Sequence, residues 1–382
     1  MPEPVLFSAT VPENMKRALF YHPQPLASQP VKGSEVRPVQ MEKAFRAIGY
    51  HVDSVTGFSY ERKKKMQKVR SLIQSGVTYD FAYVESWNVP IPLSDSHHLP
   101  LRPLQDYAFF SLLRQNQIPI GIYYRDIYWQ AEDHAYGNAW WKRIPKRLFL
   151  WIEWAMFCRC MNHLFLPTWE IRSLLPTDWP PAQTSALPPG CQIHSSRQAK
   201  GTMKEGPIEL FYVGGVTPPY YDLTPLFEIA ADLDHVHLTI CCREPEWAGQ
   251  ASYYQAIDLQ DVKIVHASSD EIGRYYTSAD MVADLRAPKG YLRTALPIKT
   301  VEAIGYEVPT IMRKGTSAAT FVEQENTGWT VGSTEEAKQL LMHLCEHPDR
   351  IVAKREKVQA AQDNHTWRAR ARQAANTLEV SS

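Results

Sequence analysis

Short apolar runs alternate with longer segments of mixed polarity along most of the chain. In the second half, apolar runs at residues 208–213, 236–241, 262–266 and 281–285 are separated by segments with helical spacing. Runs of this length are typical of buried strands, and apolar residues three or four apart are typical of helices packed on a sheet. Regular alternation of strands and helices predicts an α/β fold with parallel sheets covered on both faces.

The first half shows the same alternation, interrupted by longer Pro-rich loops. The pattern predicts strands at residues 17–21, 51–55, 80–85, 118–124 and 163–167. It predicts helices at residues 35–48, 61–70, 104–114 and 170–175. Near the end of the chain, we expect two closing helices, at residues 334–347 and 348–376.

The length of 382 residues exceeds one ordinary core and suits two domains. Residues 195–206 are polar, show no apolar period and follow a Pro-rich segment, so they resemble a linker. We therefore predict a first Rossmann-like domain at residues 1–195 and a second at residues 196–365, leaving a last helix at 366–382.

Composition narrows the classes of function. Lys+Arg and Asp+Glu both number 41, so a general nucleic-acid binder, which is expected to be basic, is disfavoured. The six cysteines form no C-x-x-C pair, and no His spacing completes a zinc site. No signal-peptide core and no apolar stretch of about 18 residues are present, so we expect a cytoplasmic protein.

Residues 281–331 carry the most specific signal. A buried strand is followed by a Pro/Gly turn and a helix that Pro297 opens, and Gly305 stands where a carboxyl-terminal cap is expected. Strands follow at residues 308–312 and from residue 328. This unit places its loop at the carboxyl end of a parallel sheet, where such sheets bind ligands.

This stretch resembles the donor-binding half of the family 4-like glycosyltransferases of GT-B fold. The resembling residues are Pro297, Lys299, Glu302, Ala303 and Gly305, then Val308-Pro309-Thr310, then Glu323 and Gly328. The resemblance implies two Rossmann-like domains facing each other across a cleft, with the last helix packed back on the first domain. It also implies retaining transfer of a sugar from a nucleotide-sugar donor to a carbohydrate or lipid-linked acceptor.

Within the resemblance, the Glu at the position of Glu302 receives the ribose hydroxyls of the donor. A carboxylate suits this role because it only accepts hydrogen bonds. The chain departs from the family at two places. Relatives commonly place an Arg and a Lys after the "G-G" strand, but the segment at residues 214–226 has neither, and Thr294 stands where many relatives have another Glu.

A replacement cation is needed because the departing diphosphate gains negative charge. We favour Arg243 and Lys299, with Arg293 and Lys289 as alternatives, and Arg suits a diphosphate because its fork is bidentate. Backbone amides of residues 290–294 are expected near the donor.

Further candidates lie at strand ends. We expect Gly215 and His266 near the donor, Gly33 at a helix start that a phosphate or sugar can approach, and Asp126 as the acceptor of a proton from an acceptor hydroxyl.

Asp232 and Asp234 have the spelling of a metal-binding pair, but they stand where a helix ends. We therefore predict a metal-independent reaction with no cofactor other than the donor substrate.

Two alternatives remain open. One is a catalytically silent nucleotide- or glycan-binding subunit of a glycan assembly complex, which the two departures slightly favour. The other is a sugar-nucleotide epimerase of the same fold, which is expected to carry more carboxylates and His around its cleft.

Residues 137–160 combine the basic cluster Lys142, Arg143, Lys146 and Arg147 with a Trp/Phe-rich segment. This pattern is typical of an interfacial helix on an anionic membrane, which would place residues 140–158 on the inner face of the membrane. A core helix with a basic amino-terminal entry explains the pattern equally well.

Overall fold

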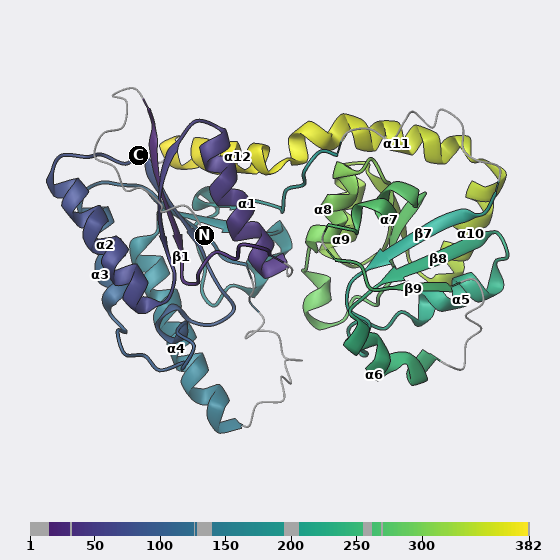
Figure 1. Cartoon of the computed structure of the whole chain (residues 1–382), viewed down its shortest axis with the longest axis horizontal. Helices are drawn as coiled ribbons and strands as arrows, with labels where there is room; N and C mark the ends of the chain where they lie inside the picture. The colour runs from purple at the N-terminus through teal and green to yellow at the C-terminus, as the bar shows by residue number, and fades with distance from the viewer. Residues whose placement is uncertain are drawn as a thin grey trace. The chain divides into compact units, whose positions relative to one another are not determined.

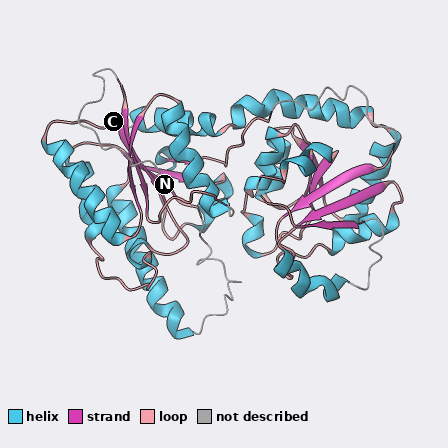
Figure 2. Cartoon of the chain, in the orientation of Figure 1, coloured by secondary structure: helices cyan, strands magenta, loops and turns pink. Residues whose placement is uncertain are grey.

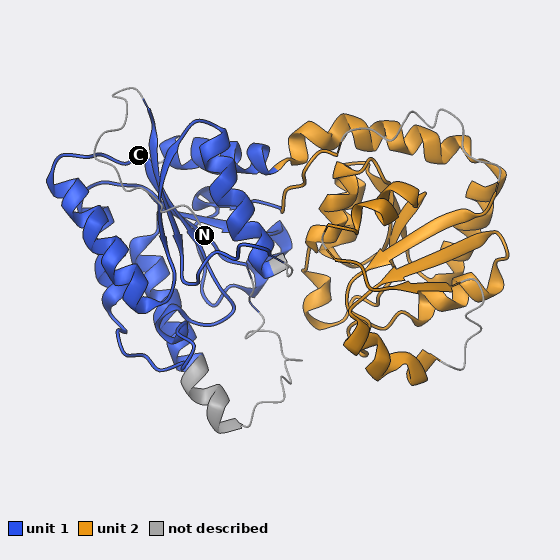
Figure 3. Ribbon diagram, viewed as in Figure 1, with its two compact units in different colours: residues 1–188, 367–382 blue, residues 189–366 orange. Residues whose placement is uncertain are grey.

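The computed structural model describes residues 15–30, 33–125, 127, 140–194, 206–254, 262–268 and 270–380, and gives no side chains for residues 140–146. The chain forms two compact units, which Figure 3 colours separately. Unit 1 comprises residues 1–188 and 367–382, and unit 2 comprises residues 189–366. Each contains a six-stranded sheet flanked by helices, as Figure 2 shows. The predicted α/β class is therefore confirmed.

The sheet of unit 1 has the order β2-β1-β3-β4-β5-β6, and all its pairings are parallel. Its strands are β1 (Arg17–His22), β2 (His51–Thr56), β3 (Phe81–Glu85), β4 (Ile120–Tyr123), β5 (His163–Leu166) and β6 (Thr184–Ala186). Its helices are α1 (Gly33–Ala47), α2 (Ser59–Gln74), α3 (Gln105–Gln115), α4 (Trp140–Cys160) and α12 (Trp367–Val380). Three short 3₁₀ turns complete it: η1 (Ile91–Leu93), η2 (Trp169–Leu174) and η3 (Pro181–Gln183).

Helix α12 belongs to unit 1 although it ends the chain, and it packs on α1 (Figure 1). Leu378 of α12 is fully buried, and its methyl groups would lie about 3 Å from a side chain at Gly121 of β4. The Glu379 carboxylate accepts from Lys16 Nζ at 2.7 Å and from the Tyr50 hydroxyl. The end of the chain is thus held by both packing and charge.

The sheet of unit 2 has the order β12-β11-β10-β7-β8-β9 and is also parallel. Its strands are β7 (Ile208–Val213), β8 (Val236–Cys241), β9 (Val262–Val265), β10 (Met281–Asp284), β11 (Thr310–Arg313) and β12 (Gly328–Val331). Its helices are α5 (Thr224–Asp232), α6 (Glu244–Tyr254), α7 (Gly273–Ser278), α8 (Ile298–Gly305), α9 (Ser317–Gln324), α10 (Thr334–Glu346) and α11 (Asp349–Ala361). The 3₁₀ turns η4 (Gly290–Arg293) and η5 (Gln362–His365) complete it.

The single helix expected at residues 348–376 is wrong, because the chain there forms α11, η5 and α12. The break coincides with contacts to residues far away in the chain. The amide of Cys191 donates to the carbonyl of His365, and Cys191 forms a parallel bridge with Thr366. The His365 ring also lies 3.0 Å from the Glu325 carboxylate. Because the backbone and side chain of His365 bind these partners, the chain does not continue as a single helix there.

Three smaller expectations also differ from the structure. Strand β6 lies within a Pro-rich segment that gave no strand signal, and the sequence pattern 269–278, expected to be helical throughout, forms a helix only from Gly273. Gly305 is the last residue of α8 rather than its cap, which is Tyr306. Its lack of a side chain serves another purpose, because a Cβ there would lie 2.1 Å from the carbonyl oxygen of Gln192.

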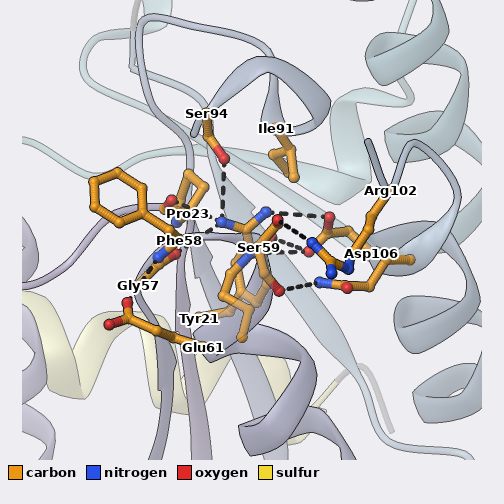
Figure 4. Close-up of polar contacts among 12 residues, drawn as sticks. Tyr21, Pro23, Gly57, Phe58, Ser59, Glu61, Ile91, Ser94, Arg102 and Asp106 are labelled. Atoms are coloured by element: carbon orange, nitrogen blue, oxygen red, sulfur yellow. Dashed lines mark hydrogen bonds and ion pairs between the residues drawn. The ribbon is translucent and has the colours of Figure 1, made fainter. Parts of the chain in front are cut away.

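A buried ion pair joins several loops at the carboxyl edge of the unit 1 sheet (Figure 4). Arg62 of α2 is fully buried and donates to Asp106 of α3 through Nε at 3.1 Å. Its Nη1 donates to the carbonyls of Pro23 and Gly57, both at 2.8 Å, and to Ser94 Oγ. Every segment that follows β1, β2 or the turn η1 is therefore tied to one guanidinium.

Helix α4 carries both features that its sequence suggested. Leu150, Trp154 and Phe157 are buried in the core of unit 1. On another face, Leu148, Trp151 and Ile152 are 58%, 42% and 48% exposed, which is unusual for large apolar side chains. No helix in the described part of the chain is both long enough and apolar enough to cross a bilayer.

We predict that Arg62→Ala lowers the free energy of unfolding by about 3–5 kcal/mol, because it leaves the buried Asp106 carboxylate without its cation. Urea denaturation followed by circular dichroism measures this. The control is Lys63→Ala, an exposed change on the same helix, which is expected to stay within about 0.5 kcal/mol of the parent. Equal stabilities of the two variants would contradict a role for Arg62 as the tie.

Candidate functional site

The order of the unit 2 sheet creates a switch point between β7 and β10. From β7 the chain adds β8 and β9 on one side, and from β10 it adds β11 and β12 on the other. Connections therefore diverge there and leave a crevice at the carboxyl ends of these strands, which is the usual ligand site of such sheets. The residues after β7 and β10 are the natural candidates.

Glu302 lies on α8 and is held by two partners. Its Oε2 accepts from Lys299 Nζ at 2.9 Å and from the Tyr276 hydroxyl at 3.3 Å. The Glu302 side chain is 24% exposed, so it is neither buried nor directed into bulk solvent. Of the predicted site residues, the structure brings Lys299 and Glu302 into direct contact.

Tyr276 of α7 supports this carboxylate from the core. The residue is fully buried, and burial together with the nearby Glu302 charge raises the pKa of its hydroxyl, so the phenol stays a hydrogen-bond donor. Its ring stacks on Tyr306 with centroids 4.7 Å apart, and the His194 ring stacks on the other face of Tyr306 at 3.8 Å. Three parallel rings therefore back the helix that carries Glu302.

Arg286 lies directly after β10 and is only 8% exposed. Its Nε and Nη2 donate to the two oxygens of Asp284 at 2.7 and 2.5 Å, which is a bidentate pair. The guanidinium also lies 4.9 Å from the centre of the Tyr221 ring, and the Tyr221 hydroxyl accepts from Tyr291 at 2.5 Å. Residues after β7 and after β10 thus meet around one cation.

A small pocket opens beside this cation. Asp284, Arg286, Pro297 and Thr316 line it, with Met312 of β11 among its apolar walls. Pro297 is the amino-terminal cap of α8, and Thr316 caps α9 by accepting from the amide of Ala319. The pocket therefore faces the amino ends of two helices, which favour anions.

The glycine loop after β7 is already occupied by a carboxylate. Glu246 Oε1 accepts from the amide of Val216 at 3.0 Å and from Thr217 Oγ1 at 3.2 Å. A side chain at Gly215 would lie 2.9 Å from the same oxygen. In this structure, the amide beside Gly215 thus serves an internal acceptor.

The other predicted residues of unit 2 are more dispersed. Arg243 follows β8, and its side chain is 68% exposed, 3.8 Å from Glu246. His266 follows β9 with Nδ1 2.9 Å from the carbonyl of Cys242. Arg293 is exposed in η4, and its carbonyl accepts from Ser317. Thr294 is half-buried, and its hydroxyl donates to the carbonyl of Tyr291 at 3.3 Å.

In unit 1, the corresponding switch point lies between β1 and β3. His22 ends β1, is 4% exposed and has Nδ1 3.2 Å from the carbonyl of Glu85. Burial lowers the pKa of His22 to about 3, so its imidazole is neutral near pH 7. Gly33 begins α1 as expected for a helix start, and Asp126 lies outside the described residues.

Sequence analysis missed Arg286, Asp284 and Tyr276. A signal for the first pair was present, since the Asp ends an apolar run and the Arg follows two positions later, at the sheet's carboxyl end. Tyr276 had no such signal. Its contact with Glu302 joins two helices 26 positions apart in the chain.

Known proteins resemble this chain in sequence over part of its length and in fold. Residues 224–376 match the model of a family described as "Glycosyl transferase-like". This segment contains Glu302, Lys299 and Arg286. Residues 224–376 are therefore similar to glycosyltransferases, and the chain has the GT-B fold. The resemblance carried by residues 281–331 is thereby confirmed.

Solved structures agree on the fold. HepE of Anabaena in complex with UDP-glucose superposes with a TM-score of 0.63 at 14% identity, covering 95% of this chain and 99% of that one. Sucrose-phosphate synthase from Thermosynechococcus elongatus gives 0.62 at 14% identity, covering 94% and 98%. WaaG, a glycosyltransferase involved in lipopolysaccharide biosynthesis, gives 0.53 at 16% identity, covering 94% and 99%. No curated protein sequence matches this chain significantly.

Proposed function

We propose that this protein is a glycosyltransferase, which binds a nucleotide-sugar donor in unit 2 and transfers its sugar to a carbohydrate or lipid-linked acceptor at unit 1. One observation carries the proposal: the Glu302 carboxylate is held by Tyr276 and Lys299 on the helix whose amino end faces the switch-point pocket. A fixed, partly exposed carboxylate suits a ribose, because it accepts from both hydroxyls without reorganising.

The diphosphate of the donor is proposed to lie at the mouth of the small pocket beside Arg286. Support comes from the amino ends of α8 and α9, whose amides and dipoles favour anions, and from the adjacent guanidinium. Relatives commonly carry an Arg and a Lys after the strand that corresponds to β7, and this chain does not. Arg286 and Lys299 are both candidates for the replacement cation. Arg243, Arg293, Thr294, Gly215 and His266 remain proposed donor contacts, with Arg243 weakened by its exposure.

The donor is proposed to be a UDP-sugar, because a protein of the same fold was solved with UDP-glucose. The reaction is proposed to be metal-independent and retaining, with cations rather than a metal meeting the departing diphosphate. Asp126 is proposed to accept the proton of the acceptor hydroxyl, and Gly33 to let the acceptor or a phosphate approach α1. In the described part of the chain, the one group of potential metal ligands lies on α10, away from these residues.

A catalytically silent subunit is the second candidate. The bidentate Asp284–Arg286 pair and the Glu246 carboxylate at the glycine loop both place negative charge where a donor phosphate would approach. An epimerase of the same fold remains a third candidate.

We predict slow hydrolysis of a UDP-sugar by the purified protein, because water can replace the acceptor, and the same rate with EDTA present. Incubation with UDP-, GDP- and dTDP-sugars, followed by chromatography of sugars and nucleotides, measures this. Tight nucleotide binding without turnover would identify the silent subunit instead. A changed sugar still attached to its nucleotide would identify the epimerase, and loss of activity with EDTA that Mn²⁺ restores would refute metal independence.

We predict that Glu302→Ala weakens nucleotide binding by about 10- to 100-fold, since it removes hydrogen bonds to a charged acceptor. Isothermal titration calorimetry with UDP measures the affinity. Glu356→Ala, an exposed change on α11, is the matched control and is expected to bind like the parent. Equal affinities of the Glu302 variant and the parent would refute the ribose assignment.

We further propose that α4 contacts an anionic membrane from the cytoplasmic side. The exposed Leu148, Trp151 and Ile152 lie on a helix whose first turns contain Lys142, Arg143, Lys146 and Arg147 in the sequence. Apolar side chains next to basic ones suit the boundary between acyl chains and anionic headgroups, where each basic residue contributes about 1 kcal/mol.

We predict that the protein co-sediments with vesicles of anionic lipid at low salt and is released at high salt. The double variant Leu148→Glu and Ile152→Glu is expected to lower the bound fraction by about fivefold, because it adds charge where acyl chains would lie. Leu101→Glu is the control, since Leu101 is an exposed leucine of unit 1 outside α4. Equal sedimentation of both variants, or none by the parent, would rule out this surface.

A further inference from the structure

The last turn of α10 places two imidazoles and a carboxylate together. His343, Glu346 and His347 occupy positions i, i+3 and i+4, which share one face of a helix. Their potential ligand atoms all lie within 4.8 Å of one another. The two imidazole rings have centroids 4.5 Å apart. Small rotations about the side-chain bonds would bring three ligand atoms around one centre.

These side chains have no competing partner among the residues that the structure describes. No hydrogen bond or ion pair there joins the imidazoles or the Glu346 carboxylate to another side chain. The support beneath them is rigid, because Leu341 and Leu344 of the same helix are fully buried in the core of unit 2. The cluster is thus preorganised by its helix rather than by contacts of its own.

The chemistry of the cluster fits a borderline divalent ion. Two imidazole nitrogens and one carboxylate oxygen form a common three-ligand set for zinc, with a fourth tetrahedral position left for water. Magnesium and calcium prefer oxygen ligands and match the set poorly. The carboxyl-terminal end of a helix also favours a cation through its dipole. The expectation that no His spacing completes a zinc site overlooked His343 and His347, which are four positions apart.

We propose that His343, Glu346 and His347 form a surface binding site for a divalent transition-metal ion of the zinc class. The site is distinct from the donor pocket. Helix α10 starts after β12 at the carboxyl edge of the sheet and runs back for about 20 Å. Its neighbour Cys345 has Sγ 3.8 Å from the carbonyl of His235, which precedes β8 at the amino edge. Figure 1 shows α10 beside α5, along the flank of the sheet.

The position of the site suggests what the ion does. His347 follows the last residue of α10, and α11 begins two positions later at Asp349. An ion held by these three residues would therefore fix the carboxyl-terminal end of α10, including its cap His347. Since it lies at the edge opposite to the donor pocket, it takes no part in sugar transfer, and the proposal does not depend on the proposed function.

The test uses the full-length protein, freed of metal with a chelator and titrated with zinc chloride in a calorimeter. The parent is expected to bind one more equivalent of Zn²⁺ than the double variant His343→Ala and His347→Ala, or to bind it at least about tenfold more tightly. Glu346→Gln is expected to lie between them. His237→Ala is the control, because it removes a half-exposed histidine at the same edge of the sheet and outside the cluster.

Two further readouts make the test specific. Co²⁺ is expected to give a tetrahedral absorption band with the parent and not with the double variant, and excess Mg²⁺ should not reduce it. Zn²⁺ is expected to raise the unfolding temperature of the parent alone, while the metal-free proteins unfold alike. Equal Zn²⁺ uptake by the parent and the double variant would overturn the proposal. A loss of Zn²⁺ affinity in His237→Ala as large as that in the double variant would overturn it too.

Discussion

The parallel pairing of β7 with β10 is the constraint on which the proposed donor site depends. These strands are far apart in the chain, yet Leu210 pairs with Met281 and Phe211 with Val282. Because the chain leaves them in opposite directions, the loops that follow diverge and leave a crevice at their carboxyl ends. Arg286, Tyr221 and the amino end of α8 all meet there as a consequence of this one register.

Charges at this edge are held in place before any donor binds. Arg286 is fixed by a bidentate carboxylate and an aromatic ring, and Glu302 by a buried phenol and a lysine. Such groups lose little freedom on binding, which is how preorganised sites favour charged ligands. The Asp284 carboxylate has an opposite effect, since a diphosphate would have to compete with it for Arg286. Under the proposed function, two effects oppose each other: the preorganised charges favour donor binding, and the competition of Asp284 for Arg286 disfavours it. Their balance distinguishes an active transferase from a silent subunit.

In unit 1, buried charged and polar groups hold the loops at the carboxyl edge of the sheet. Its loops at the carboxyl edge are long, and a fully buried Arg62 collects their carbonyls and the Asp106 carboxylate. Glu153 of α4 accepts from the amide of Ile91 at 2.7 Å, and burial raises its pKa to about 8. Satisfied polar groups inside the unit therefore position the loops.

The sequence by itself determined the α/β class, nearly all strands and the Glu302 helix, because these depend on periodicity and on residues close together in the chain. The His343–His347 spacing is equally local. The tertiary structure alone decided that Arg286 lies beside Tyr221, that Tyr276 reaches Glu302, and that Glu246 occupies the amide beside Gly215. It also broke the last helix at residues 362–366, where the backbone pairs with Cys191. Each of these contacts depends on which strands become neighbours, and no local pattern of apolar and polar residues encodes that choice.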